Sequence, residues 1–216
     1  MRLSDEDRRL LTAYVLTDPS NALALHRENP SLVEEAILEP DLLARLSGDP
    51  VLFSTLILGL NPTPYQLRFL NSSSKRIIIR WPRQSGKTLS LAAYAVWFAV
   101  SHASTTTLIV APSRRQSMIL NDVIQGLIDG APKKVRAAFL RRRLRTMTYL
   151  RNGSRIVALP NSENLLRGYT AHLIILDEAA FFQNDEAIFQ HVLTPMLATT
   201  GGRMIVSSTP WGKRTT

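Results

Sequence analysis

KRIIIRWPRQSGKT, residues 75–88, joins a short β-branched strand to a tight loop that ends in Gly86-Lys87-Thr88. An apolar helix pattern begins directly after the loop, so the loop amides and the helix N-terminus are expected to point at an anion. We expect Lys87 to reach the β- and γ-phosphates of a nucleotide and the Thr88 hydroxyl to ligate Mg²⁺. The strict P-loop pattern has glycine where Trp81 stands, and the last three residues alone also occur by chance.

Residues 173–178, LIILDE, supply the second half of the expected nucleotide site. Four aliphatic residues in a row are typical of a buried parallel strand, and the carboxyl end of such a strand is where α/β sheets bind ligands. We expect Asp177 to hold the hydration shell of Mg²⁺ and Glu178 to act as the general base that deprotonates the attacking water. An ordinary acidic turn is the alternative, but it leaves the upstream loop unexplained. Together the two stretches predict an ATP site.

A third strand is expected at residues 203–206, and it ends in Ser207-Ser208-Thr209. Hydroxyl groups at a strand end beside the γ-phosphate can sense whether that phosphate is present. The residues alone fit equally well with the start of a loop, where serine and threonine are common.

Alternating periodicities predict an α/β fold: a mainly parallel sheet flanked by helices, of the P-loop NTPase class. Strands are expected at 75–80, 105–111, 173–177 and 203–208, and helices at 65–70, 87–101, 114–128 and 185–197. Asn152-Gly153 predicts a hairpin within 144–159.

The first 60 residues are predicted to be a helical N-terminal extension, with the P-loop domain covering residues 61–216. Ser4 with Asp7, and Ser31 with Glu34, have the spacing of capping boxes at helix starts.

Composition sets limits on the environment of the protein. The 216 residues contain no cysteine, which excludes disulfides and thiolate metal sites, and no apolar run is long enough to span a bilayer. No secretory signal opens the sequence. A soluble, cytoplasmic protein without a membrane partner is therefore expected.

The net charge of +9 is concentrated in one segment. Residues 113–155 carry 11 of the 26 basic residues and 2 of the 17 acidic ones, so this segment holds the whole excess. Such a face favours a polyanion such as DNA, contacted through its phosphates, and the leading candidates are Lys133, Lys134, Arg141, Arg142 and Arg143. A solvated basic surface, or a patch for an acidic protein, remains open.

Several motifs together resemble one family. Residues 61–212 resemble the ATPase domain of the large terminase subunit, the DNA-packaging motor of tailed bacteriophages. Members typically lack the first P-loop glycine and carry Arg-Gln-x-Gly-Lys-Thr/Ser, as residues 83–88 do here. The runs NGSRIVALP (152–160) and LRGY (166–169), upstream of DEAA (177–180), are also similar to the family.

The resemblance implies further roles for individual residues. Arg83 is similar to an arginine that senses the nucleotide phosphates, and Tyr65 with Gln66 stand where a Tyr-Gln pair contacts adenine. Arg167, 11 residues before Glu178, resembles an arginine finger that a neighbouring subunit inserts, although a structural salt bridge is the alternative. The remaining residues implied to bind nucleotide or to couple hydrolysis to movement are Gln84, Ser85, Gly86, Ser208 and Thr209.

The resemblance also implies an activity and partners. These are Mg²⁺-dependent ATP hydrolysis that drives double-stranded DNA into a procapsid, in the host cell cytoplasm, with a portal protein, a small terminase subunit and a homo-oligomeric ring. A monomer remains open for the isolated chain. The family's C-terminal nuclease domain has no counterpart before Thr216, so nuclease activity is not expected. Two rival interpretations are a superfamily 2 helicase-like fragment and a non-hydrolysing DNA-binding assembly module.

Overall fold

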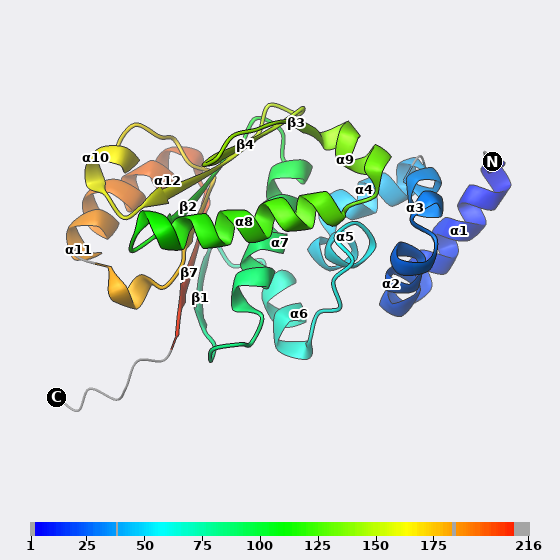
Figure 1. Ribbon diagram of the computed structural model, residues 1–216, viewed down its shortest axis with the longest axis horizontal. Helices are drawn as coiled ribbons and strands as arrows, with labels where there is room; N and C mark the ends of the chain where they lie inside the picture. Colours follow the sequence, from blue (N-terminus) through cyan, green and yellow to red (C-terminus); the bar gives the residue numbers. More distant parts are fainter. Residues whose placement is uncertain (1–2, 38, 183–184, 210–216) are drawn as a thin grey trace.

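The structure is a computed structural model that describes residues 3–37, 39–182 and 185–209. Five short helices come first along the chain (Figure 1). They are α1 (Asp5–Thr17), α2 (Pro19–Glu28), α3 (Pro30–Ala36), α4 (Pro40–Gly48) and α5 (Pro50–Leu56). Helices α2 to α5 each begin with proline, whose fixed φ suits the first helical position and whose missing N–H costs nothing there.

The two expected capping boxes have different outcomes. Ser4 and Asp7 form one at the start of α1, as predicted. The box predicted for Ser31 and Glu34 is wrong, because α3 already begins at Pro30 and places Ser31 inside the helix.

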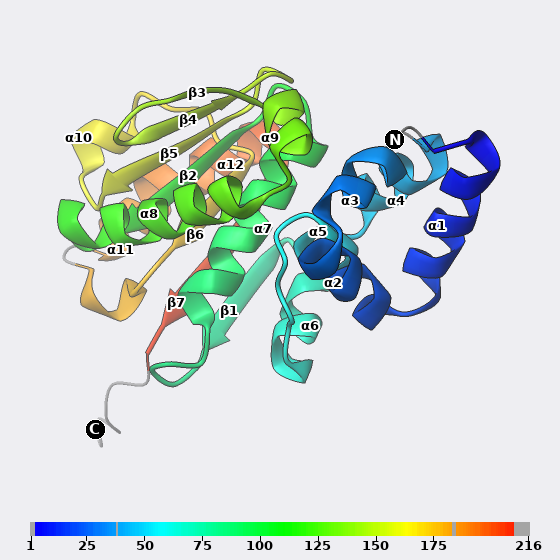
Figure 2. The same ribbon diagram turned by 45° about the vertical axis from the view of Figure 1, so that its right-hand side comes forward.

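A seven-stranded sheet has the order β1-β7-β6-β2-β5-β4-β3 (Figure 2). The first five strands of this order are parallel, β4 runs antiparallel to β5, and β3 runs antiparallel to β4. This confirms the predicted mainly parallel α/β class. The strands are β1 (Arg76–Arg80), β2 (Thr106–Ala111), β3 (Leu140–Arg143), β4 (Met147–Leu150), β5 (Arg155–Pro160), β6 (Leu173–Leu176) and β7 (Arg203–Ser208).

Helices cover both faces of the sheet (Figures 1 and 2). Strand β2 is buried along its whole length, and its neighbouring residues Leu108 and Ile109 belong to different apolar clusters, as expected for side chains that alternate between faces. The helices after α5 are α6 (Pro64–Leu70), α7 (Lys87–Ser101), α8 (Arg114–Gly130), α9 (Lys133–Phe139), α10 (Glu163–Leu166), α11 (Asp185–Ile188) and α12 (Thr194–Thr200).

Helix α7 is the central helix of one face. Its interior residues, from Ser90 to Trp97, are all buried, which explains why it is apolar all round. It packs against α8 and also against α4 and α5 of the N-terminal helices. The first apolar cluster therefore runs without interruption from the N-terminal helices to the sheet.

Two elements of the basic segment were not predicted. Helix α9 and strand β3 lie in a stretch whose only clear sequence feature is its positive charge, and β3 consists of Leu-Arg-Arg-Arg, without alternation of apolar and polar residues. The stretch predicted as one helix at 185–197 is α11, a π-helical turn at Phe189–Leu193, and α12. None of the helices in the described ranges has the length and apolar character needed to cross a bilayer.

Candidate active site

Strand β1 leads into the loop that opens α7, and the loop backbone is tightly curled. Gln84 and Gly86 both have left-handed φ angles, 60° and 74°. A Cβ at position 86 would lie 2.4 Å from the Gln66 side-chain nitrogen, so glycine is needed here for space as well as for conformation. Inside the loop the Ser85 hydroxyl donates to the Pro82 carbonyl at 2.8 Å.

Helix α6 braces this loop from behind. The Tyr65 hydroxyl donates to the Ser85 carbonyl at 2.8 Å, and the Gln66 side-chain amide donates to the same oxygen at 3.2 Å. Trp81 packs edge-on against the Tyr65 ring with centroids 4.9 Å apart, and also contacts Phe69 at 6.0 Å. The bulky residue at the position of the usual glycine therefore anchors the loop to α6.

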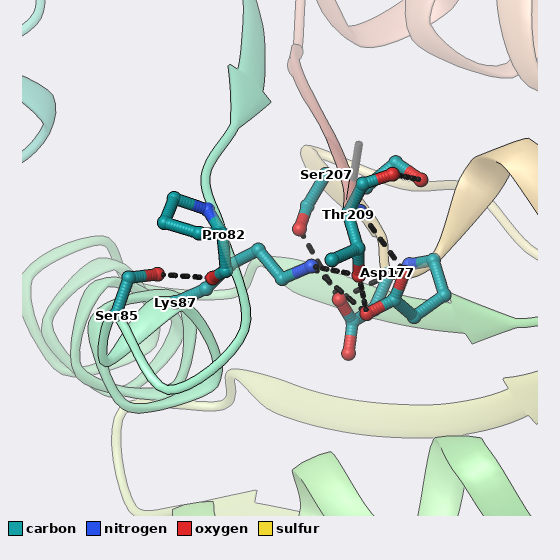
Figure 3. A network of polar contacts seen from close by, with 8 residues as sticks. Pro82, Ser85, Lys87, Asp177, Ser207 and Thr209 are labelled. Carbon is teal, nitrogen blue, oxygen red and sulfur yellow. Dashed lines mark hydrogen bonds and ion pairs between the residues drawn. The ribbon is translucent and has the colours of Figure 1, made fainter. Parts of the chain in front are cut away.

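Lys87, Glu178 and Thr209 form a closed polar cluster where three segments meet; Figure 3 shows Lys87 and Thr209 pointing toward one another beside Asp177. The Lys87 ammonium donates to Glu178 Oε1 at 2.8 Å and to Thr209 Oγ1 at 3.2 Å. The backbone N–H of Thr209 donates to Glu178 Oε2 at 3.1 Å, and its hydroxyl lies within 2.8 Å of both carboxylate oxygens. The P-loop lysine and the proposed base are therefore in direct contact.

Asp177 lies next to this cluster and is buried. Its Oδ1 accepts from the Ser207 hydroxyl at 3.2 Å and from the Glu178 backbone N–H at 3.1 Å. Burial raises the pKa of the Asp177 carboxyl above its usual value, and the positive charge of Lys87 opposes that rise only in part. A cation bound beside this buried carboxylate would stabilise its charged form.

Glu178 has a different environment and an unusual backbone. Burial alone would raise the pKa of its carboxyl, but the hydrogen bonds from Lys87 and Thr209 outweigh burial and lower the pKa. The carboxylate is therefore ionised at neutral pH. The backbone of Glu178 has a left-handed φ of 52°, a conformation that non-glycine residues adopt mainly where the surrounding structure imposes it.

The oxygen atoms at the carboxyl end of the sheet suit Mg²⁺ better than a metal ion that needs three or more protein ligands. Within the part of the chain that the structure describes, no three His, Cys, Asp or Glu side chains gather to hold a metal. Asp177 and the Thr88 hydroxyl offer hard oxygen atoms, and Mg²⁺ is typically held by one or two such groups together with water and substrate phosphates. Thr88 and Asp177 would hold the ion.

A cleft of 420 Å³ opens over the loop. The predicted residues that line it are Arg83, Gln84, Gly86, Lys87, Thr88, Glu178 and Thr209. Val123, from α8, also lines the cleft and was not predicted, because an aliphatic residue in an amphipathic helix carries no signal of such a role. The structure thus brings together the loop after β1, the start of α7, the residues that follow β6 and β7, and one residue of α8.

Other predicted residues lie beside the cleft or away from it. Ser208 directs its hydroxyl toward the carbonyl of Thr209, whereas Ser207 is the serine that contacts Asp177. Strand alternation was the signal that could have singled out Ser207. Arg167 lies on the surface at the end of α10, does not line the cleft, and pairs with Glu163.

The predicted DNA-binding residues separate into two groups. Lys134 and Arg143 form ion pairs, with Glu34 at 3.2 Å and with Asp129 at 2.7 Å. The exposed side chains of Lys133, Arg141 and Arg142 make no hydrogen bond or ion pair with any residue in the described ranges.

Comparisons with known proteins point to one family. The sequence model of the family described as "Terminase large subunit, T4likevirus-type, N-terminal" matches residues 78–215. The large terminase subunits of Thermus virus P23-45 and Thermus phage G20c are each 27% identical over 175 residues, which cover 72% of this chain and 35% of each relative. The chain therefore spans about a third of the length of these curated relatives.

Solved structures share the fold. The large terminase ATPase domain of Thermus phage P74-26 superposes with a TM-score of 0.64 at 24% identity, over 73% of this chain and 68% of that one. The large terminase of bacteriophage HK97 gives a TM-score of 0.59 at 18% identity, over 69% and 33%. With its P-loop fold and with most of its length matched by the family's sequence model, this chain belongs to the large terminase subunit family.

Proposed function

We propose that this chain is the Mg²⁺-dependent ATPase of a viral DNA-packaging motor, and that it uses hydrolysis to translocate double-stranded DNA into a procapsid. The observation that carries the proposal is the convergence of Lys87, Asp177 and Glu178 at one edge of the sheet. These groups come from the ends of two parallel strands, and their chemistry matches phosphate binding, cation binding and water activation.

The residues of the cleft divide the work between binding and positioning. The loop amides, Lys87 and Arg83 would hold the phosphates, and Tyr65 with Gln66 would lie on the adenine side. Mg²⁺, when bound, would offset charge on the β- and γ-phosphates. Glu178 would orient the attacking water and accept its proton, since its carboxylate is ionised and sits beside the P-loop lysine.

Thr209 and Ser208 would couple this chemistry to movement. Thr209 contacts both oxygens of Glu178 and also Lys87, so any displacement of either side chain by a phosphate changes the contacts of the residue that follows β7. A pure binding module needs no water-activating carboxylate, which is why we favour the hydrolytic function over an assembly module.

Arg167 would act on the cleft of a neighbouring copy. Its side chain is 63% exposed, and its ion pair with Glu163 is a surface contact of the kind that contributes little to stability. Its exposed position on α10 suits a residue that completes the cleft of a second subunit in a homo-oligomeric ring. A portal protein and a small terminase subunit would be the other partners, in the host cell cytoplasm.

Phosphate release tests this proposal directly. Wild-type protein at high concentration, with ATP and Mg²⁺, should release phosphate, and duplex DNA should stimulate the release. Glu178→Gln should bind ATP without turnover, whereas Lys87→Ala should lose binding. Turnover retained by Glu178→Gln would remove this residue from the role of base, and absence of turnover in the wild type under all conditions would refute the function.

A further inference from the structure

The structure shows which cations of the basic segment are already neutralised. Lys134 reaches Glu34 at 3.2 Å and Glu35 at 3.9 Å, both on α3, so it ties α9 to the N-terminal helices. Arg136 and Arg143 share the carboxylate of Asp129, at 3.5 and 2.7 Å. These three cations act within the protein.

Two more cations are engaged by neutral groups. Arg151 donates through its Nε to the Ala137 carbonyl at 2.9 Å. Arg155 donates to the Thr106 hydroxyl at 3.1 Å and lies over the Tyr169 ring at 5.6 Å. Both side chains are fixed in position by the fold and are less available to an outside partner.

Five arginines of the segment remain exposed, and their side chains make no hydrogen bond or ion pair with the described residues. We call them the basic strip: Arg114, Arg115, Arg141, Arg142 and Arg145. Lys133 is also exposed, but it begins α9, which precedes β3 and so lies toward the opposite edge of the sheet from the nucleotide cleft.

The topology brings the basic strip to one corner of the molecule. Helix α8 starts just after the carboxyl end of β2, the same edge at which the P-loop leaves β1. Strand β3 runs in the direction of β5, so the β3–β4 turn at 144–146 lies at that edge too. Figure 2 shows β3 as the outermost strand of the sheet, whereas α8 packs over β2 and β5.

A direct contact joins the two parts of the strip. The Asn121 side chain, on α8, donates to the Arg145 carbonyl at 3.1 Å, about 9 Å along the helix from Arg115. Val123, on the same helix, lines the nucleotide cleft. One exposed acid, Asp122, lies on this part of α8, so the corner keeps a large positive excess.

We propose that the basic strip binds the phosphate backbone of duplex DNA next to the nucleotide cleft. The inference rests on the proposed function, and it adds which surface of the chain contacts the DNA. Arginine forks match phosphate oxygens, and no aromatic residue belongs to the strip, which suits backbone contact rather than base stacking. An alternative role for the arginines of β3 is to prevent another chain from pairing with this free edge strand. That role does not account for Arg114 and Arg115, which lie on α8.

The strip is large enough for several phosphates. Arg141 and Arg142 lie on β3, where each residue advances the chain by about 3.3 Å, and Arg145 lies on the turn that follows. Duplex DNA carries one charge per about 1.7 Å of its axis. Five phosphate contacts give a slope of about −4.5 for the logarithm of the binding constant against the logarithm of the salt concentration.

The experiment compares two triple variants of the full chain for binding to a fluorescent duplex across a salt series. Combining Arg141→Ala, Arg142→Ala and Arg145→Ala should make the salt slope shallower by about 3. The matched control combines Arg9→Ala, Arg27→Ala and Lys75→Ala, three exposed cations outside the strip, and should keep the wild-type slope. Melting temperatures of both variants should stay near wild type, because none of these side chains is buried.

Lysine replacements at the same three strip positions should restore most of the slope, since backbone contact needs charge. A slope unchanged in the strip variant, or reduced equally in the control, would overturn the proposal and leave the strip to an acidic protein partner. Phosphate release without DNA is measured in parallel. Its absence in the wild type would refute the ATPase proposal, whereas normal release with an unchanged salt slope would refute only the DNA-binding surface.

Discussion

The contact between Lys87 and Glu178 predicts that removing the charge of Glu178 strengthens ATP binding. The ammonium and the carboxylate oxygen are 2.8 Å apart, and the two side chains are only 7% and 25% exposed. A nucleotide that recruits Lys87 to its phosphates must first break this ion pair. Glu178→Gln leaves a neutral acceptor that holds the lysine less firmly.

The size of the effect follows from the strength of such bonds. A hydrogen bond to a charged group contributes about 1.5–3 kcal/mol, and the neutral amide still retains part of it. A net gain of about 1.4 kcal/mol corresponds to roughly tenfold tighter binding. Loss of repulsion between the carboxylate and the γ-phosphate acts in the same direction.

Titration with a fluorescent ATP analogue and Mg²⁺ measures this gain, with Glu28→Gln as the control. Glu28 is exposed and far along the chain from the cleft residues, so its variant has the same charge change and should bind as wild type does. Unchanged or weaker binding by Glu178→Gln would show that the ion pair does not compete with the nucleotide.

Three further predictions concern stability and assembly. Burial raises the pKa of Asp177, so this group favours folding below its ordinary pKa and loses that contribution as the pH rises through its folded value. Asp177→Asn should therefore raise the melting temperature at pH 7 by a few degrees, at about 2–4 °C per kcal/mol, and this gain should shrink in acid. The same variant should lose Mg²⁺-dependent ATP binding. Trp81→Gly removes ring contacts with α6 and should destabilise the protein by about 2 kcal/mol in urea titration, whereas no loss would mean that the loop needs no such anchor. Arg167→Ala should leave the melting temperature within about 1 °C and reduce phosphate release only at concentrations where subunits assemble, and an equal loss in the monomer would contradict action between subunits.

Much of this site could be predicted from the sequence, because most of its residues come directly after strands of the parallel sheet. The loop 81–88 comes after β1, and Asp177 with Glu178 come after β6, so the parallel sheet alone brings them to one edge. The confirmed hairpin around Asn152-Gly153 was equally local, since that dipeptide favours one turn geometry.

Contacts between distant segments were not readable. Lys134 contacts Glu34, which lies 100 positions earlier in the sequence. Charge alone made Lys134 a candidate DNA-binding residue, whereas this contact gives it a role within the protein. Strand β3 has no alternating pattern, because its arginines lie on a free sheet edge where both faces are accessible. The ion pair between Lys87 and Glu178 joins two residues whose roles were predicted separately.

A crystal structure with a non-hydrolysable ATP analogue and Mg²⁺ tests the central claim most directly. We expect the Lys87 ammonium to leave Glu178 for the β- and γ-phosphates, with the metal ion held on the side of Thr88 and Asp177. A nucleotide bound outside this cleft, or a Lys87–Glu178 pair that stays intact beside the bound phosphates, would contradict the account.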